Sequence, residues 1–137
     1  MNYLLDTNHW SHLQKSHPAL MARVNSLPDD ATLYISVVSQ GELLAGIDLT
    51  PPGARKQLLE AWYRDVASKF VVLQITPDVA RHYARIFAAL RRAGTPIETN
   101  DIWIAAIAQA YDLTVASADR HFRFVSGLPV EDWTVSE

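Results

Sequence analysis

The sequence contains no cysteine, and this absence excludes several kinds of chemistry at once. A thiolate nucleophile, a disulfide scaffold, a zinc–cysteine site and an iron–sulfur cluster are all ruled out. Long apolar runs are also missing, because no stretch approaches the roughly eighteen uncharged apolar residues of a membrane span. The first residues reach Asp6 without the basic start and apolar stretch of a signal peptide. We therefore expect a cytoplasmic protein with no membrane association.

An excess of positive charge is absent as well. The chain has 15 acidic and 12 basic residues, which give a net charge of −3. This balance argues against a simple basic nucleic-acid clamp, although a local basic rim remains compatible with it. The 137 residues are 49% hydrophobic and 20% charged, as in ordinary globular proteins. We expect one domain over residues 1–137 with its own hydrophobic core.

Short apolar runs alternate with helical patterns along the chain. The expected strands are residues 3–5, 33–36, 70–75, 113–116 and 130–135. Helices are expected over residues 19–26, from residue 39 onward, and over residues 54–68, 77–93 and 100–111. This alternation predicts an α/β fold, a three-layer α/β/α domain with a central, mainly parallel sheet. The continuously apolar run 70–75 predicts a strand that is covered on both faces.

Four acidic residues lie where an expected strand ends or an expected helix begins. They are Asp6, Glu42, Asp101 and Asp119. Ligands of parallel sheets bind at the carboxyl ends of the strands, so these side chains are expected to converge. Two carboxylates about 5 Å apart repel each other by roughly 3 kcal/mol at an effective dielectric constant near 20. A cluster of four must therefore take up protons or bind cations.

Oxygen ligands without histidine or cysteine favour Mg²⁺ or Mn²⁺. Such ions activate water and stabilise the attacking and leaving oxygens in phosphodiester hydrolysis. Three of the acids also have a structural interpretation. Glu42 has the spacing of a capping box with Ser39, and Asp101 and Asp119 suit the first turn of a helix.

Four segments together resemble the PIN-domain ribonucleases, and specifically the VapC-type toxins of type II toxin–antitoxin systems. The segments are residues 3–8, 39–43, 100–106 and 118–122, with 125–128 following the last. The resemblance implies an Mg²⁺- or Mn²⁺-dependent endoribonuclease with an α/β/α fold. It implies that Asp6, Glu42, Asp101 and Asp119 hold the metal. Polar side chains beside them would support the acids, and these are Thr7, Asn8, Asn100 and Ser117.

The resemblance also implies partners. Such toxins act on RNA, are usually homodimers, and are held inactive by a small antitoxin that places a basic side chain near the acids. Contact with DNA is expected only through that antitoxin. An acidic toxin and a basic inhibitor segment attract each other, which suits the net charge of this chain.

Several other residues have two interpretations. Arg91 and Arg92 either hold RNA phosphates at the rim of the site or simply favour the end of a helix. His9 and His12 are expected in solvent-facing or rim positions, since no His-Glu-x-x-His pattern is present. His121 is expected to pack behind the acidic pocket.

Two functions other than a nuclease are considered for this sequence. One is a catalytically silent PIN-like module that binds protein or RNA. The other is a phosphoacceptor receiver domain, which needs an acidic pair after its first strand and a lysine after a late strand. The segment that follows the first strand is Asp6-Thr7-Asn8, and no lysine follows the late strand, so we set this alternative aside.

Overall fold

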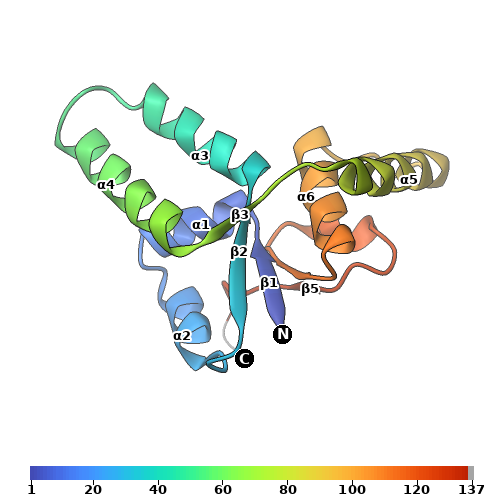
Figure 1. Ribbon diagram of the computed structural model, residues 1–137, viewed down its shortest axis with the longest axis horizontal. Coiled ribbons are helices and arrows are strands. Elements are labelled where there is room, and N and C mark those ends of the chain that lie inside the picture. The colour runs from blue at the N-terminus through green and yellow to red at the C-terminus, as the bar shows by residue number, and fades with distance from the viewer. Residues whose placement is uncertain (136–137) are drawn as a thin grey trace.

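A five-stranded parallel sheet forms the centre of the protein in the computed structural model, which describes residues 1–135 (Figure 1). The strand order is β3-β2-β1-β4-β5. The strands are β1 (Asn2–Leu5), β2 (Thr32–Ser36), β3 (Val71–Leu73), β4 (Thr114–Ala116) and β5 (Val130–Glu131). The predicted α/β fold with a central parallel sheet is confirmed. The end of the predicted domain, residues 136 and 137, lies outside the described residues.

Helices cover both faces of the sheet. They are α1 (Thr7–Gln14), α2 (Pro18–Ser26), α3 (Val37–Leu49), α4 (Ala54–Lys69), α5 (Pro77–Ala93) and α6 (Thr99–Ala110), followed by the short 3₁₀ helix η1 (Arg120–Phe124). Figure 1 shows α1 to α4 on one side of the sheet and α5 and α6 on the other. No helix of residues 1–135 is long and apolar enough to cross a membrane.

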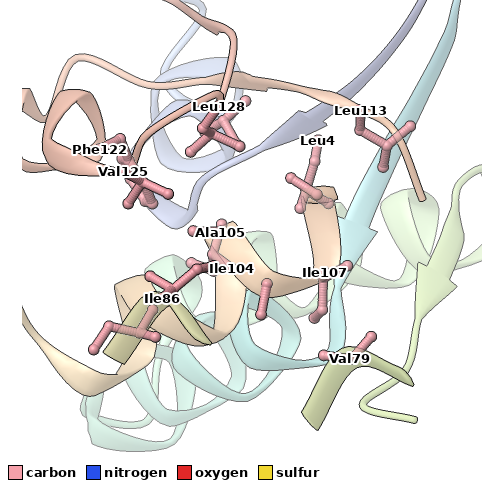
Figure 2. Close-up of a cluster of buried hydrophobic side chains, with 14 of the residues drawn as sticks. Leu4, Val79, Ile86, Ile104, Ala105, Ile107, Leu113, Phe122, Val125 and Leu128 are labelled. Carbon is pink, nitrogen blue, oxygen red and sulfur yellow. The ribbon is translucent and has the colours of Figure 1, made fainter. Parts of the chain in front are cut away.

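Side-chain alternation in β1 divides the core into two parts, one on each face of the sheet. Leu4 packs into the cluster formed with α5 and α6, which Figure 2 shows in close-up. Tyr3 and Leu5 point to the opposite face, into the cluster formed with α1 to α4. This is the period-two geometry of a strand buried on both faces. The strand that carries Asp6 at its end is therefore fixed from both sides.

The strand register aligns the carboxyl ends that carry the site. Leu5 lies opposite Ile35 of β2 and opposite Ala116 of β4. The backbone N–H of Asp6 continues this ladder and donates to the Ala116 carbonyl at 3.1 Å. Residues that follow β1, β2 and β4 therefore emerge at the same edge of the sheet.

Both ends of α5 lie where the predicted helix over residues 77–93 places them. The hydroxyl of Thr76 accepts from the N–H of Val79 at 3.2 Å, and Pro77 is the first residue of the helix. Gly94 ends the helix in the left-handed conformation with φ 73°, which a residue without a Cβ adopts readily. Pro18 likewise opens α2, at a position where a helix tolerates proline.

Both edge strands are shorter than predicted. β3 spans three residues and ends the sheet on one side, where Val71 is 60% exposed. The prediction that this run is covered on both faces holds for Val72 and Leu73, which pack into the clusters on opposite faces of the sheet, and fails for Val71 in this outermost strand. β5 spans only two residues on the other side. Beyond β5, Trp133 packs edge-on against Tyr3, with the ring centroids 5.0 Å apart.

Candidate active site

Asp6 is a buried carboxylate with only 5% of its surface exposed. It is the N-cap of α1, and its Oδ1 accepts the backbone N–H of His9 at 2.8 Å. Its Oδ2 accepts a hydrogen bond from the hydroxyl of Ser117. Burial raises the pKa of Asp6 to about 6 in spite of these hydrogen bonds, and the negative charges of Asp119 and Glu42 raise it further.

Ser117 connects the first and fourth acids. Its hydroxyl donates to Asp6 and accepts the backbone N–H of Asp119 at 2.9 Å. Asp119 is the N-cap of η1, and its Oδ1 accepts the N–H of His121 at 2.9 Å and lies 3.0 Å from the His121 ring nitrogen Nδ1. Ser117 was predicted to assist Asp119, and the structure places it against both Asp119 and Asp6.

Glu42 is joined to α1 through Thr7. The hydroxyl of Thr7 donates to Glu42 Oε1 at 2.7 Å and shares a second hydrogen bond with Ser39 Oγ at 2.9 Å. Ser36, not Ser39, is the N-cap of α3, because its side chain accepts the N–H of Ser39. The structure therefore does not form the capping box considered for Glu42. Thr7, expected to support the acids, contacts Glu42.

Asp101 lies half-buried in the first turn of α6. Burial raises its pKa to about 6, and the charges of Asp119, Asp6 and Glu42 contribute to the shift. The negative charges of the other three acids thus raise the pKa of Asp101, and those of Asp119 and Glu42 also raise the pKa of Asp6. Asp6, Glu42 and Asp119 therefore all lie close enough to Asp101 for their charges to act on it. The neighbouring Asn8 and Asn100 are exposed.

The chemistry of this donor set fits a hydrated hard cation. The side chains offer carboxylate and hydroxyl oxygens, and their repulsion is relieved by positive charge. Within residues 1–135, no three Asp, Glu or His side chains are arranged to hold one ion directly. Mg²⁺ keeps several waters and binds proteins through one or two carboxylates, so a ready-made cage of three ligands is not required.

Two histidine predictions are wrong. His9 is completely buried rather than solvent-facing, because its ring lies between Asp6 and Trp133. Burial lowers its pKa to about 4. His121 is exposed beside Asp119 rather than packed behind the acids, while its neighbour Phe122 is the residue that enters the core.

Arg91 and Arg92 lie exposed in the last turn of α5, where they suit the helix dipole. The guanidinium of Arg91 lies over the ring of Phe87 at 5.0 Å from the centroid. Their contact with RNA phosphates stays a prediction.

A groove of about 240 Å³ runs beside Glu42 between α1, α3 and α4. Its walls include Lys15, Leu43, Arg55 and Trp62. A larger cavity of about 680 Å³ lies between α2 and residues 131–135, and none of the four acids lines it. Of these two cavities, the groove beside Glu42 is the one that adjoins the candidate site.

Comparison with known proteins bears on the family and on the fold. The PIN domain family profile matches residues 3–128. The plasmid stability protein StbB of Pseudomonas syringae is 39% identical over 122 residues, which cover 85% of this chain and 86% of that protein. The tRNA(fMet)-specific endonuclease VapC of Shigella flexneri is 29% identical over 98% of this chain and 99% of its own length. The solved structure of VapBC-1 from Haemophilus influenzae matches with a TM-score of 0.86 and 28% identity, covering 98% of this chain and 100% of the matched one.

The fold thus has its counterpart in a known class of proteins. The chain belongs to the PIN domain family. Proteins named VapC are among its relatives, which confirms the predicted resemblance to the VapC-type members of that family.

Proposed function

We propose that this protein is the toxin of a toxin–antitoxin pair and an endoribonuclease dependent on Mg²⁺ or Mn²⁺. The observation that carries the proposal is the half-buried Asp101 and the buried Asp6 at one edge of the sheet, both within reach of the negative charges of Glu42 and Asp119. The relative from Shigella flexneri, named as a tRNA-specific endonuclease, supports the assignment to RNA hydrolysis.

In this proposal Asp6 and Asp101 are the principal metal ligands, and Glu42 and Asp119 complete the negative pocket. The bound cation supplies positive charge for the scissile phosphate and for an attacking water. The Ser117 hydroxyl would orient Asp6 by donating to its Oδ2, and the Thr7 hydroxyl would orient Glu42 by donating to its Oε1. Supporting contacts of this kind commonly set metal affinity. Asn8 and Asn100, exposed beside the acids, are proposed to contact substrate or ordered water.

The groove beside Glu42 is proposed to seat a segment of the antitoxin. Its apolar wall would receive apolar side chains, and a basic antitoxin side chain would reach the acids. The protein is further proposed to form a homodimer and to contact DNA only through the antitoxin. Arg91 and Arg92 are proposed phosphate contacts for RNA.

Incubation of the purified chain with total RNA and separately with transfer RNA tests the proposed activity. With Mg²⁺ or Mn²⁺ we expect discrete fragments whose ends can be mapped. Excess EDTA is expected to abolish them, because the carboxylates alone supply no positive charge to the phosphate. Equal cleavage with EDTA would reveal a contaminating or metal-independent nuclease. Absence of cleavage by a protein shown to bind Mn²⁺ would instead favour a silent binding module.

Thr7→Val is expected to lower the affinity for Mn²⁺ by about 10-fold to 100-fold, the usual cost of losing a supporting contact. The substitution removes the hydroxyl that donates to Glu42 and keeps the shape of the side chain. Thr7→Ser keeps the hydroxyl and is the matched control. Titration calorimetry of both variants gives the comparison, and equal affinities would show that the Thr7 hydroxyl does not position Glu42.

A further inference from the structure

His9 occupies an unusual place beside the acids. Its side chain is completely buried in the first turn of α1. Ring nitrogen Nε2 accepts the backbone N–H of Trp133 at 3.1 Å. Ring nitrogen Nδ1 lies 3.5 Å from Asp6 Oδ1 and makes no hydrogen bond within residues 1–135. A buried polar atom therefore faces the most buried of the four carboxylates.

The contact with Trp133 settles which nitrogen carries the proton. A backbone N–H can donate only to a nitrogen with a free lone pair, so Nε2 is unprotonated. The proton of the imidazole is then on Nδ1, the nitrogen that faces Asp6. The tautomer fixed by the C-terminal segment is thus the one that presents an N–H to the acid.

Trp133 is firmly held, so it can fix the ring. Only 2% of its surface is exposed, and its ring packs edge-on against Tyr3 of the central strand. Its indole N–H donates to Glu131 Oε1 at 3.1 Å. Trp133 is therefore anchored both to β1 and to the end of β5.

The donors around Asp6 divide between its two oxygens. Oδ2 receives the Ser117 hydroxyl, while Oδ1 receives the backbone N–H of His9 at 2.8 Å and faces the Nδ1–H of the same residue. A carboxylate has about four lone-pair positions, so this arrangement leaves one face of Asp6 for a cation. The imidazole is the one donor here that a side-chain substitution in α1 can remove.

We propose that His9 is a positioning residue that orients the Asp6 carboxylate for divalent cation binding, with its own tautomer set by the backbone of Trp133. This inference rests on the proposed function, because it assigns His9 a role at the same carboxylates. It also makes Trp133 a structural support of the site, although Trp133 lies 124 residues from His9 along the chain.

Two substitutions at position 9 separate the two ring nitrogens. His9→Asn places an amide N–H near the position of Nδ1 and loses the acceptor for Trp133. His9→Gln places an amide oxygen near the position of Nε2 and loses the donor to Asp6. Both replace the buried imidazole ring with a smaller amide side chain, so both lose packing contacts.

We expect His9→Gln to bind Mn²⁺ about 10-fold or more weakly than the native chain. His9→Asn is expected to keep more of the affinity and instead to expose the Trp133 amide to hydrogen exchange.

Titration calorimetry with Mn²⁺ is the primary measurement. Equal affinities for the native chain and His9→Gln, or a loss in His9→Asn as large as that in His9→Gln, would overturn the proposal.

Nitrogen-15 NMR of the native chain tests the proposal without any variant. We expect a protonated Nδ1 and an unprotonated Nε2, and the opposite tautomer would overturn it. Because these readouts need no RNA, a native chain that binds Mn²⁺ but cuts no RNA would contradict the proposed function alone.

Discussion

Asp6→Asn is expected to lower the rate of RNA cleavage by at least about 10³-fold. A bound cation contributes several kcal/mol of charge stabilisation to the transition state, and each 1.36 kcal/mol is a factor of ten in rate. Asparagine keeps the helix cap of α1 because it accepts the N–H of His9 as aspartate does. It removes the negative charge that we propose binds the metal.

The rate is measured under single-turnover conditions with saturating Mn²⁺, using a mapped RNA fragment as substrate. Asp29→Asn is the matched control, because the same chemical change occurs on an exposed turn residue. We expect the control to cleave at the native rate and Asp101→Asn to behave like Asp6→Asn. If Asp6→Asn retained a tenth or more of the native rate, Asp6 would not be a principal metal ligand.

The same substitution is expected to stabilise the metal-free protein at neutral pH by up to about 3 kcal/mol. The pKa of Asp6 rises from 3.8 to about 6 in the folded protein, and each unit of such a shift corresponds to about 1.36 kcal/mol. Between these two pH values the folded state binds more protons than the unfolded state, so Asp6 makes the protein less stable as the pH rises. Asparagine resembles the protonated carboxyl and avoids this loss.

Urea unfolding in EDTA, with the native chain and Asp6→Asn side by side, measures the effect. The variant is expected to gain its advantage between about pH 4 and pH 6 and to hold it at pH 7.5. Both proteins are measured because the lowered pKa of His9 makes the folded state more stable as the pH rises, opposite to the effect of Asp6. This contribution of His9 is present in both proteins and cancels in their difference. A variant less stable than the native chain at pH 7.5 would show that Asp6 is not strained by burial and neighbouring charge.

Much of the site follows from local sequence signals. Apolar runs that end abruptly mark strand ends, and Asp6 directly follows such a run. In a parallel sheet with right-handed connections, strand ends share an edge, so acids placed after them converge without any contact being known. The bounds of the helix over residues 77–93 could also be predicted, because a helix cap depends on neighbours only a few residues away.

What the sequence left undetermined depends on contacts between distant residues. Thr7 contacts Glu42 across 35 positions, and His9 contacts Trp133 across 124. No periodicity of α1 distinguishes a buried histidine from a rim histidine, since its burial depends on where the chain beyond β5 packs. The exposure of Val71 likewise follows from the position of β3 in the sheet order, which its own residues do not specify.

The central claim is that the four carboxylates bind a divalent cation, and titration calorimetry with Mn²⁺ at pH 7.5 tests it most directly. At this pH both Asp6 and Asp101 are mainly ionised, since the pKa of each is about 6. We expect saturable binding by the native chain and at least a 10-fold loss of affinity in Asp6→Asn and in Asp101→Asn. Native protein that binds no Mn²⁺, or binds it equally well after both substitutions, would contradict the account.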